Sequence, residues 1–186
     1  MEIRKYQKKD SEALHKICIE TADQRFVKTD KQQEAICLLF LDYYLLNESE
    51  NVLVLANEKD EACGYIVCSV NPDLFKVENK KYAKRIMKRS FFLGLFAYFQ
   101  NKTAFKLNAK YNCGMHMNIT KDYQGKRYGV LLIDKMYQNI VSLGYSRLHL
   151  VTKNKNTRGY GFYKKYGFTP VKKCSFGSIL MVYNGK

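Results

Sequence analysis

The sequence is short of the features that define several classes of protein. No window holds the roughly 18 consecutive apolar residues that a membrane-spanning helix needs, and the longest apolar run covers only residues 91–99. The N-terminus is charged and lacks the apolar region of a signal peptide. A chain of 186 residues suits one core better than two. We therefore expect residues 1–186 to form a single domain in the cytoplasm, without a membrane partner.

Proline and paired cysteines are also scarce. Only two prolines occur, so helices and strands can run without interruption. The six cysteines are scattered, with no C-x-x-C pair and no His/Cys cluster of zinc spacing. This pattern indicates buried, reduced thiols, and we expect no metal ion.

Acidic residues are scarce in one part of the chain only. Residues 1–62 hold nine Lys/Arg and thirteen Asp/Glu, whereas residues 63–186 hold 23 basic and four acidic residues. The net charge of +15 therefore comes from the C-terminal two-thirds. Such an asymmetry indicates either two partners of opposite charge or a lysine-rich surface that keeps the protein in solution.

The hydrophobic pattern alternates between the periods of strands and helices. Strands are expected at about residues 3–6, 51–56, 64–70, 112–119, 147–152, 171–173 and 179–183. Helices are expected from residue 11 and at about residues 31–46, 79–99, 127–143 and 157–166. This order predicts an α/β fold with a mixed sheet, a strand–helix–strand crossover in its middle and a helical insertion at about residues 71–110.

Two glycines and two cations occupy the junction of a strand and a helix at residues 119–130. Gly125 and Gly129 allow the backbone to approach a phosphate closely. Lys126 and Arg127 add positive charge where the helix dipole already favours an anion. The segment has neither a Walker A nor a Rossmann pattern. It is therefore either a pyrophosphate-binding loop or an ordinary polar loop.

A second motif lies about thirty residues further on, at residues 156–168. Asn156 suits a helix N-cap, and Tyr163 follows seven residues later on the same side of the helix. A tyrosine near a cofactor thiol could protonate a departing thiolate, because the two pKa values lie near 10 and 8.5. The alternative is a capping asparagine and a core tyrosine.

At this spacing, the two motifs together resemble the GNAT superfamily of N-acetyltransferases. That family's phosphate-binding motif is Q/R-x-x-G-x-G/A, and residues 124–129 read Q-G-K-R-Y-G. Its later motif is N-x-x-A-x-x-(apolar)-Y-x-x-x-G-F, which residues 156–168 match with Gly159 in place of alanine. Arg127 stands where the family usually has its first core glycine. The resemblance is specific over residues 115–168 and loose over residues 1–70.

The resemblance implies a GNAT-like acyl-CoA N-acyltransferase fold, with a mixed, mostly antiparallel sheet and helices on both faces. It implies acetyl-CoA as co-substrate and direct attack by a primary amine, with no covalent enzyme intermediate. Tyr163 would be the catalytic residue that protonates the leaving thiolate. The residues implied to bind acetyl-CoA are Met117, Asn118, Ile119, Gln124, Gly125, Lys126, Arg127, Gly129, Val130 and Asn156.

The acceptor amine is less well defined. In the resembled family it usually meets the first two helices, which here carry acidic residues, so we expect a cationic acceptor, either a small molecule or a peptide. These acidic residues are Glu20, Asp23, Asp30, Glu34 and Asp42. The base that deprotonates the amine is left open between the candidates His15, His116, His149 and Asp122.

Residues 80–99 begin with cations and continue with aromatic residues. The segment is a wall over the acceptor site, a contact in a homodimer, a surface for an anionic membrane or nucleic acid, or an ordinary helix with a buried phenylalanine face. Two functions other than catalysis also remain: a catalytically silent acetyl-CoA-binding protein, and a basic nucleic-acid-binding module. No helix-turn-helix or zinc pattern supports the second, so a nucleic-acid partner is not expected.

Overall fold

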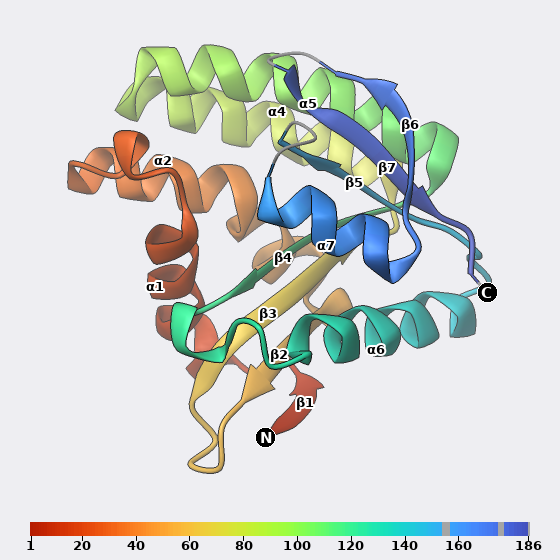
Figure 1. The fold of residues 1–186 in the computed structure, drawn as a ribbon. Coiled ribbons are helices and arrows are strands. Elements are labelled where there is room, and N and C mark those ends of the chain that lie inside the picture. Colours follow the sequence, from red (N-terminus) through yellow and green to blue (C-terminus); the bar gives the residue numbers. More distant parts are fainter. Residues whose placement is uncertain (154–156, 175–176, 186) are drawn as a thin grey trace.

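The fold is built on one seven-stranded sheet with strand order β1-β2-β3-β4-β5-β7-β6 (Figure 1). This computed structural model describes residues 1–153, 157–174 and 177–185, without the side chains of residues 100–102. The strands are β1 (Glu2–Lys5), β2 (Val52–Ala56), β3 (Ala62–Ser69), β4 (Cys113–Ile119), β5 (Leu148–Thr152), β6 (Thr169–Lys173) and β7 (Ile179–Tyr183). The α-helices are α1 (Ser11–Thr21), α2 (Asp30–Phe40), α3 (Asp42–Asn47), α4 (Pro72–Arg89), α5 (Phe91–Tyr111), α6 (Tyr128–Ser142) and α7 (Arg158–Tyr166).

The sheet is antiparallel except between β4 and β5. These two strands are parallel, and α6 connects them across one face of the sheet. The predicted mixed sheet with a strand–helix–strand crossover is thereby confirmed.

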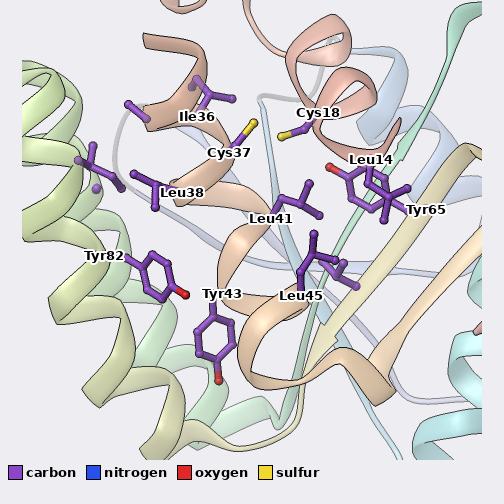
Figure 2. Packing of buried hydrophobic residues seen from close by; sticks show 14 of the residues in the cluster. Leu14, Cys18, Ile36, Cys37, Leu38, Leu41, Tyr43, Leu45, Tyr65 and Tyr82 are labelled. Carbon is purple, nitrogen blue, oxygen red and sulfur yellow. The ribbon is translucent and has the colours of Figure 1, made fainter. Parts of the chain in front are cut away.

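Two hydrophobic cores lie on opposite faces of the sheet. Alternation along β3 divides them, because Tyr65 and Val67 face one core while Ile66 and Cys68 face the other. The first core is covered by α1 to α5 and the second by α6 and α7. Figure 2 shows part of the first core, to which α1, α2, α3, α4 and β3 contribute side chains, with Tyr65 of β3 close to Leu14 of α1.

Two helices expected to be continuous are each divided in two. The helix expected at residues 31–46 breaks at Leu41, whose backbone is not helical (φ −132°, ψ −53°). The helix expected at residues 79–99 breaks at Ser90, which is extended and caps α5 by accepting a hydrogen bond from the Leu93 amide. These predictions were wrong about continuity, because both breaks interrupt stretches whose hydrophobic pattern stays helical. Together α4 and α5 form a helical hairpin over the segment expected to be an insertion.

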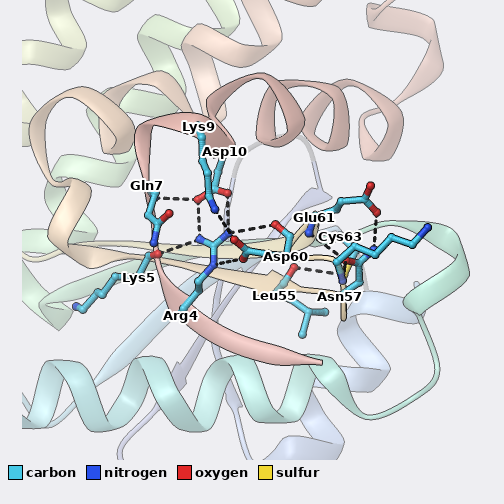
Figure 3. A network of polar contacts seen from close by, with 11 residues as sticks. Arg4, Lys5, Gln7, Lys9, Asp10, Leu55, Asn57, Asp60, Glu61 and Cys63 are labelled. Carbon is cyan, nitrogen blue, oxygen red and sulfur yellow. Dashed lines mark hydrogen bonds and ion pairs between the residues drawn. The ribbon is translucent and has the colours of Figure 1, made fainter.

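A buried ion pair fastens the first strand to its neighbours (Figure 3). The Arg4 guanidinium donates to both carboxylate oxygens of Asp10 at 2.8 Å, and its Nε donates to Asp60 at 2.7 Å. Asp10 also accepts a hydrogen bond from the Gln7 amide at 2.8 Å. Burial alone would raise the pKa of Asp10, but the bonds from Arg4 and Gln7 outweigh it and lower that pKa. The pair thus joins β1, the start of α1 and the β2–β3 turn.

Candidate active site

The strands β4 and β5 separate soon after they meet. Their parallel ladder has only two residue pairs, Cys113 with Leu148 and Gly114 with His149. Beyond Gly114, β4 continues to pair with β3 on its other edge as far as Ile119. Among the described residues, the edge of β4 that faces β5 therefore has no strand partner from Met115 onward. Met117, Asn118 and Ile119 all lie in this part of β4. Unpaired backbone groups at such an edge can bond the amides of an extended ligand.

The loop after β4 leads into α6 through two residues in the left-handed region. Gly125 has φ 80° and Arg127 has φ 67°. Arg127 is the N-cap of α6, so the position where the resembled family usually has glycine is one where the backbone conformation favours glycine. This explains the family's preference in physical terms and shows that arginine is accommodated there at some conformational cost.

The backbone amides of this loop differ in whether they are already bonded. The Gln124 amide donates to the Lys121 carbonyl at 3.2 Å, and the Val130 amide donates to the Arg127 carbonyl at 3.0 Å. Within the described chain, no acceptor bonds the amides of Gly125, Lys126, Arg127 or Gly129. Four of the six amides predicted to meet the pyrophosphate are thus free to do so, at the positive end of α6.

Gly129 lies where neighbouring side chains pack closely against the first turn of α6. A side-chain carbon placed there would lie 2.9 Å from Cζ of Phe162 and 3.3 Å from Cε of Met117. The lack of a side chain therefore allows α6, α7 and β4 to meet at one point. Gly125 is different, since the nearest atom to such a carbon is Nη2 of Arg158 at 3.8 Å.

Arg158 is a site residue that sequence reasoning missed. Its Nη1 donates to Oε1 of Gln124 at 3.0 Å, and Nε2 of Gln124 donates to the Ile119 carbonyl at 2.7 Å. The Gln124 side chain thus ties the end of β4 to the first turn of α7. Arg158 adds an exposed guanidinium beside Gly125. Nothing in the local sequence indicated this contact, because the two residues are 34 positions apart.

Tyr163 lies half-buried on α7, in the same core as β4 and α6. Its ring meets Phe162 and Phe168 edge to face, with centroids 5.2 Å and 5.5 Å apart. No hydrogen bond joins its hydroxyl to another described residue. Burial raises the pKa of Tyr163 to about 12, so the phenol keeps its proton at neutral pH.

Asn156, expected to cap α7 and to contact the pantetheine arm, lies outside the described residues. The N-cap of α7 is Thr157, whose side chain accepts a hydrogen bond from the Tyr160 amide. The N-cap of α7 therefore lies one residue later than expected, at a threonine, whose side chain caps helices by the same chemistry as asparagine.

None of the three histidines has the properties of a base that takes a proton near neutral pH. A hydrogen bond to Asp42 at 2.7 Å raises the pKa of His15 to about 9, so that imidazole stays protonated. Burial lowers the pKa of His116 and of His149 to about 4, so both stay neutral. His116 stacks on Phe40 with centroids 5.3 Å apart, and its Nε2 lies 3.3 Å from Nδ2 of Asn118.

The acidic residues of the first helices are mostly paired with cations. Glu34 forms an ion pair with Arg89, and Asp42 pairs with His15. Asp23 bonds Arg25 at 2.8 Å and reaches Lys153, just after β5, at 3.4 Å. Asp30, Glu34 and Asp42 line one cavity of about 350 Å³, together with His15, Ile19, Gln33, Cys37, Leu38, Arg85 and Arg89. The negative charge expected to face an acceptor is thus largely balanced within the protein.

The described residues contain no group of three or more His, Cys, Asp or Glu side chains that could hold a metal ion. None of the helices among these residues is long and apolar enough to cross a membrane.

The sequence matches the family described as "Acetyltransferase (GNAT) family" over residues 14–168. No curated protein matches it. The seven-stranded fold is similar to solved structures throughout its length. One is SsHAT, with a TM-score of 0.85 and 20% identity, where the match covers 98% of this chain and 96% of that one.

Two other solved structures cover equally large parts of the chain. The PaiA N-acetyltransferase of Thermoplasma acidophilum, in complex with coenzyme A, has a TM-score of 0.65 and 16% identity, with 99% of this chain and 98% of that one covered. The ribosomal-protein-alanine N-acetyltransferase of Brucella melitensis has a TM-score of 0.61 and 14% identity, with 99% of each chain covered. These likenesses confirm the expected fold.

Proposed function

Because this chain belongs to the GNAT acetyltransferase family, we propose that residues 1–186 form a single domain that transfers an acetyl group from acetyl-CoA to a primary amine. One observation carries the proposal: the unpaired edge of β4 leads directly to a helix N-terminus with free amides. An extended amide-bearing arm followed by a pyrophosphate is complementary to that succession of backbone groups.

The cofactor is proposed to lie along β4 and over the loop that follows. The backbone of Met117, Asn118 and Ile119 would bond the acetyl carbonyl and the pantetheine amides. The amides of Gly125, Lys126, Arg127 and Gly129 would hold the pyrophosphate, with Gln124 and Val130 shaping the loop. Asn156 would contact the pantetheine arm. To this set we add Arg158, whose guanidinium lies beside Gly125 and can bond a phosphate oxygen.

The proposed chemistry is direct attack of a neutral amine on the thioester carbonyl. The new C–N bond forms, the C–S bond breaks, and the electron pair leaves with the sulfur of CoA. Tyr163 would give its proton to that thiolate. The nitrogen is positively charged once the C–N bond has formed and would release a proton to solvent, and the tyrosinate would regain its proton from solvent. A pKa of about 12 keeps the phenol protonated until the thiolate appears. Proton transfer from Tyr163 to the CoA thiolate becomes more favourable if burial in the same site also raises the pKa of the CoA thiol.

We propose an amine as acceptor but no positive charge on the rest of that molecule, because most acidic residues of the first helices already form ion pairs within the protein. The neighbours named above include a ribosomal-protein-alanine N-acetyltransferase, so both small and peptide amines belong in a screen. A lysine-like amine has a pKa near 10.4 and must lose a proton before attack. Since no histidine here suits that role, we propose that the proton leaves through solvent.

A titration with acetyl-CoA tests the proposal, with ATP as the control ligand. Saturation at about 100 times the dissociation constant should stabilise the native state by roughly 2.7 kcal/mol and raise Tm by several degrees. Release of free CoA thiol over a panel of amines then measures catalysis. A shift with acetyl-CoA but no thiol release would indicate a catalytically silent acetyl-CoA-binding protein. No shift at all would contradict the cofactor site.

A further inference from the structure

The first half of α5 is apolar on every side, yet the protein covers only one of those sides. Residues 91–99 contain no charged residue. Leu93, Gly94 and Ala97 are buried against the rest of the fold. A helix that is apolar all round is normally covered all round. The uncovered side of α5 therefore points to an occupant outside this chain.

The uncovered side is a single helical stripe of large side chains. Phe92 is 83% exposed and Phe91 is 64% exposed, while the remaining three are 42–52% exposed. Their spacing of i, i+1, i+4, i+7 and i+8 places them on one face of the helix. The stripe consists of Phe91, Phe92, Leu95, Tyr98 and Phe99. Scattered exposed apolar residues are normal, but a contiguous line of this kind marks a binding surface.

The surface is held in a fixed position by the turn of the hairpin. A side-chain carbon at Gly94 would lie only 2.4 Å from Cα of Met87, so α4 and α5 touch through their backbones near Ser90. The Arg89 side chain also forms an ion pair with Glu34 of α2. Figure 1 shows the hairpin running along one margin of the molecule, so that its turn lies at the periphery.

The stretch of chain that carries this stripe is rich in positive charge and has no acidic residue of its own. Residues 79–121 contain ten Lys/Arg and no Asp/Glu. Lys80, Lys84 and Lys88 follow each other at intervals of four on the exposed side of α4, and none of them pairs with a described acidic residue. The last of them stands four positions from Phe92, across the turn. The occupant must therefore be anionic and must also accept aromatic side chains.

We propose that the α4–α5 hairpin docks on the surface of an anionic lipid bilayer. Phe91, Phe92 and Leu95 would enter the boundary between headgroups and acyl chains, while the lysines of α4 lie against the headgroups. Neither signal is sufficient by itself, because stable peripheral attachment takes an apolar and an electrostatic contribution together. The hairpin supplies both without crossing the membrane.

A second copy of the chain fits this surface less well. A twofold contact between two hairpins would place like charges opposite each other, because no acidic residue lies between residues 79 and 121. Nucleic acid would accept the charge and could stack on the rings, but the lysines lie on α4 and the rings on α5, so the two are not interleaved as they are along a single-strand groove. Both alternatives give distinct results in the experiment.

Vesicle sedimentation of the full chain tests the proposal. Phosphatidylglycerol–phosphatidylcholine vesicles should retain the protein at low salt, and pure phosphatidylcholine vesicles should not. Phe92→Ser should weaken retention about tenfold, as expected for one buried phenylalanine. Leu46→Ser is the matched control, because Leu46 is 71% exposed but lies on α3, outside the stripe. Lys84→Glu should also weaken retention, whereas Lys59→Glu in the β2–β3 turn should not.

Three results would overturn the proposal. The first is no retention by anionic vesicles, and the second is retention that Phe92→Ser leaves unchanged. The third is a stable dimer or a nucleic-acid complex that Phe92→Ser abolishes while vesicles still fail to bind. The hairpin lies outside the proposed cofactor site, so the acetyl-CoA thermal shift should be the same in all four variants. That shift separates failure of this inference from failure of the proposed activity.

Discussion

Substituting Arg127 by glycine and by alanine tests whether its left-handed backbone is a property of the fold. Both variants remove the guanidinium, so the difference between them reports the backbone alone. At a φ of 67°, a residue with a Cβ atom pays about 1–2 kcal/mol that glycine avoids. Glycine loses about 0.5–1 kcal/mol more conformational entropy on folding. Arg127→Gly should therefore be more stable than Arg127→Ala by about 0.5–1 kcal/mol.

Gly161 provides the matched comparison, because it lies in the ordinary helical part of α7. A side-chain carbon placed there meets nothing within 4 Å, and its φ is not in the left-handed region. Alanine should therefore be the better residue, so Gly161→Ala should raise stability by about 0.5–1 kcal/mol. The glycine–alanine preference at position 127 is thus expected to be opposite to that at position 161.

Urea unfolding of the three variants and the parent measures these differences, with Tm from calorimetry as a second readout. A change of 1 kcal/mol corresponds to about 2–4 °C for a chain of this size. If Arg127→Ala equals or exceeds Arg127→Gly in stability, the left-handed conformation at the start of α6 is refuted. The account of why glycine is usual at that position would then fail with it.

Three further predictions concern catalysis, cofactor binding and pH. Tyr163→Phe should lower kcat by about 100-fold or more while calorimetry shows unchanged acetyl-CoA affinity; equal turnover would exclude a role as acid. Arg158→Ala should weaken acetyl-CoA binding about tenfold, the value of one charge-assisted bond, whereas Lys165→Ala on the far part of α7 should not. Asp10→Asn should cost about 3 kcal/mol at pH 7. Because the folded pKa of Asp10 is lowered, that cost should be present above the unfolded pKa near 3.9 and fade as pH falls through the lower folded value.

The sequence allowed the sheet and its crossover to be predicted, because alternation along strands such as β3 is a local signal. The helix breaks were missed, although Ser90 has the residue type of an N-cap and Gly94 follows it by four positions. A cap signal is easily overlooked when the hydrophobic pattern continues through it. Leu41 carried no such signal, because leucine favours helices and its non-helical backbone is visible only in the structure, where its side chain is fully buried.

The loop that we propose to bind phosphate was indicated by the sequence, since its glycines and cations are contiguous in the chain. Arg158 was not, because its contact with Gln124 exists only when α7 lies beside the loop. The ion pairs of the acidic residues were equally hard to predict. Glu34 pairs with Arg89, and Asp23 pairs with Lys153 in addition to Arg25, although Arg89 and Lys153 lie far along the chain. Charge counts by region therefore overestimated the negative field near the first helices.

The two-pair ladder between β4 and β5 has a consequence for the lifetime of the protein. This short ladder is the strand pairing between a block of β1 to β4 and a block of β5 to β7. Helix α5 also connects the two blocks, because its Leu107 packs against Leu180 and Val182 of β7. A ligand bonded along the open edge of β4 would act as the missing strand and raise the cost of opening this junction. Proteolysis of the transiently opened form would then slow as acetyl-CoA accumulates. The amount of this protein in a cell would thus follow the supply of its proposed co-substrate.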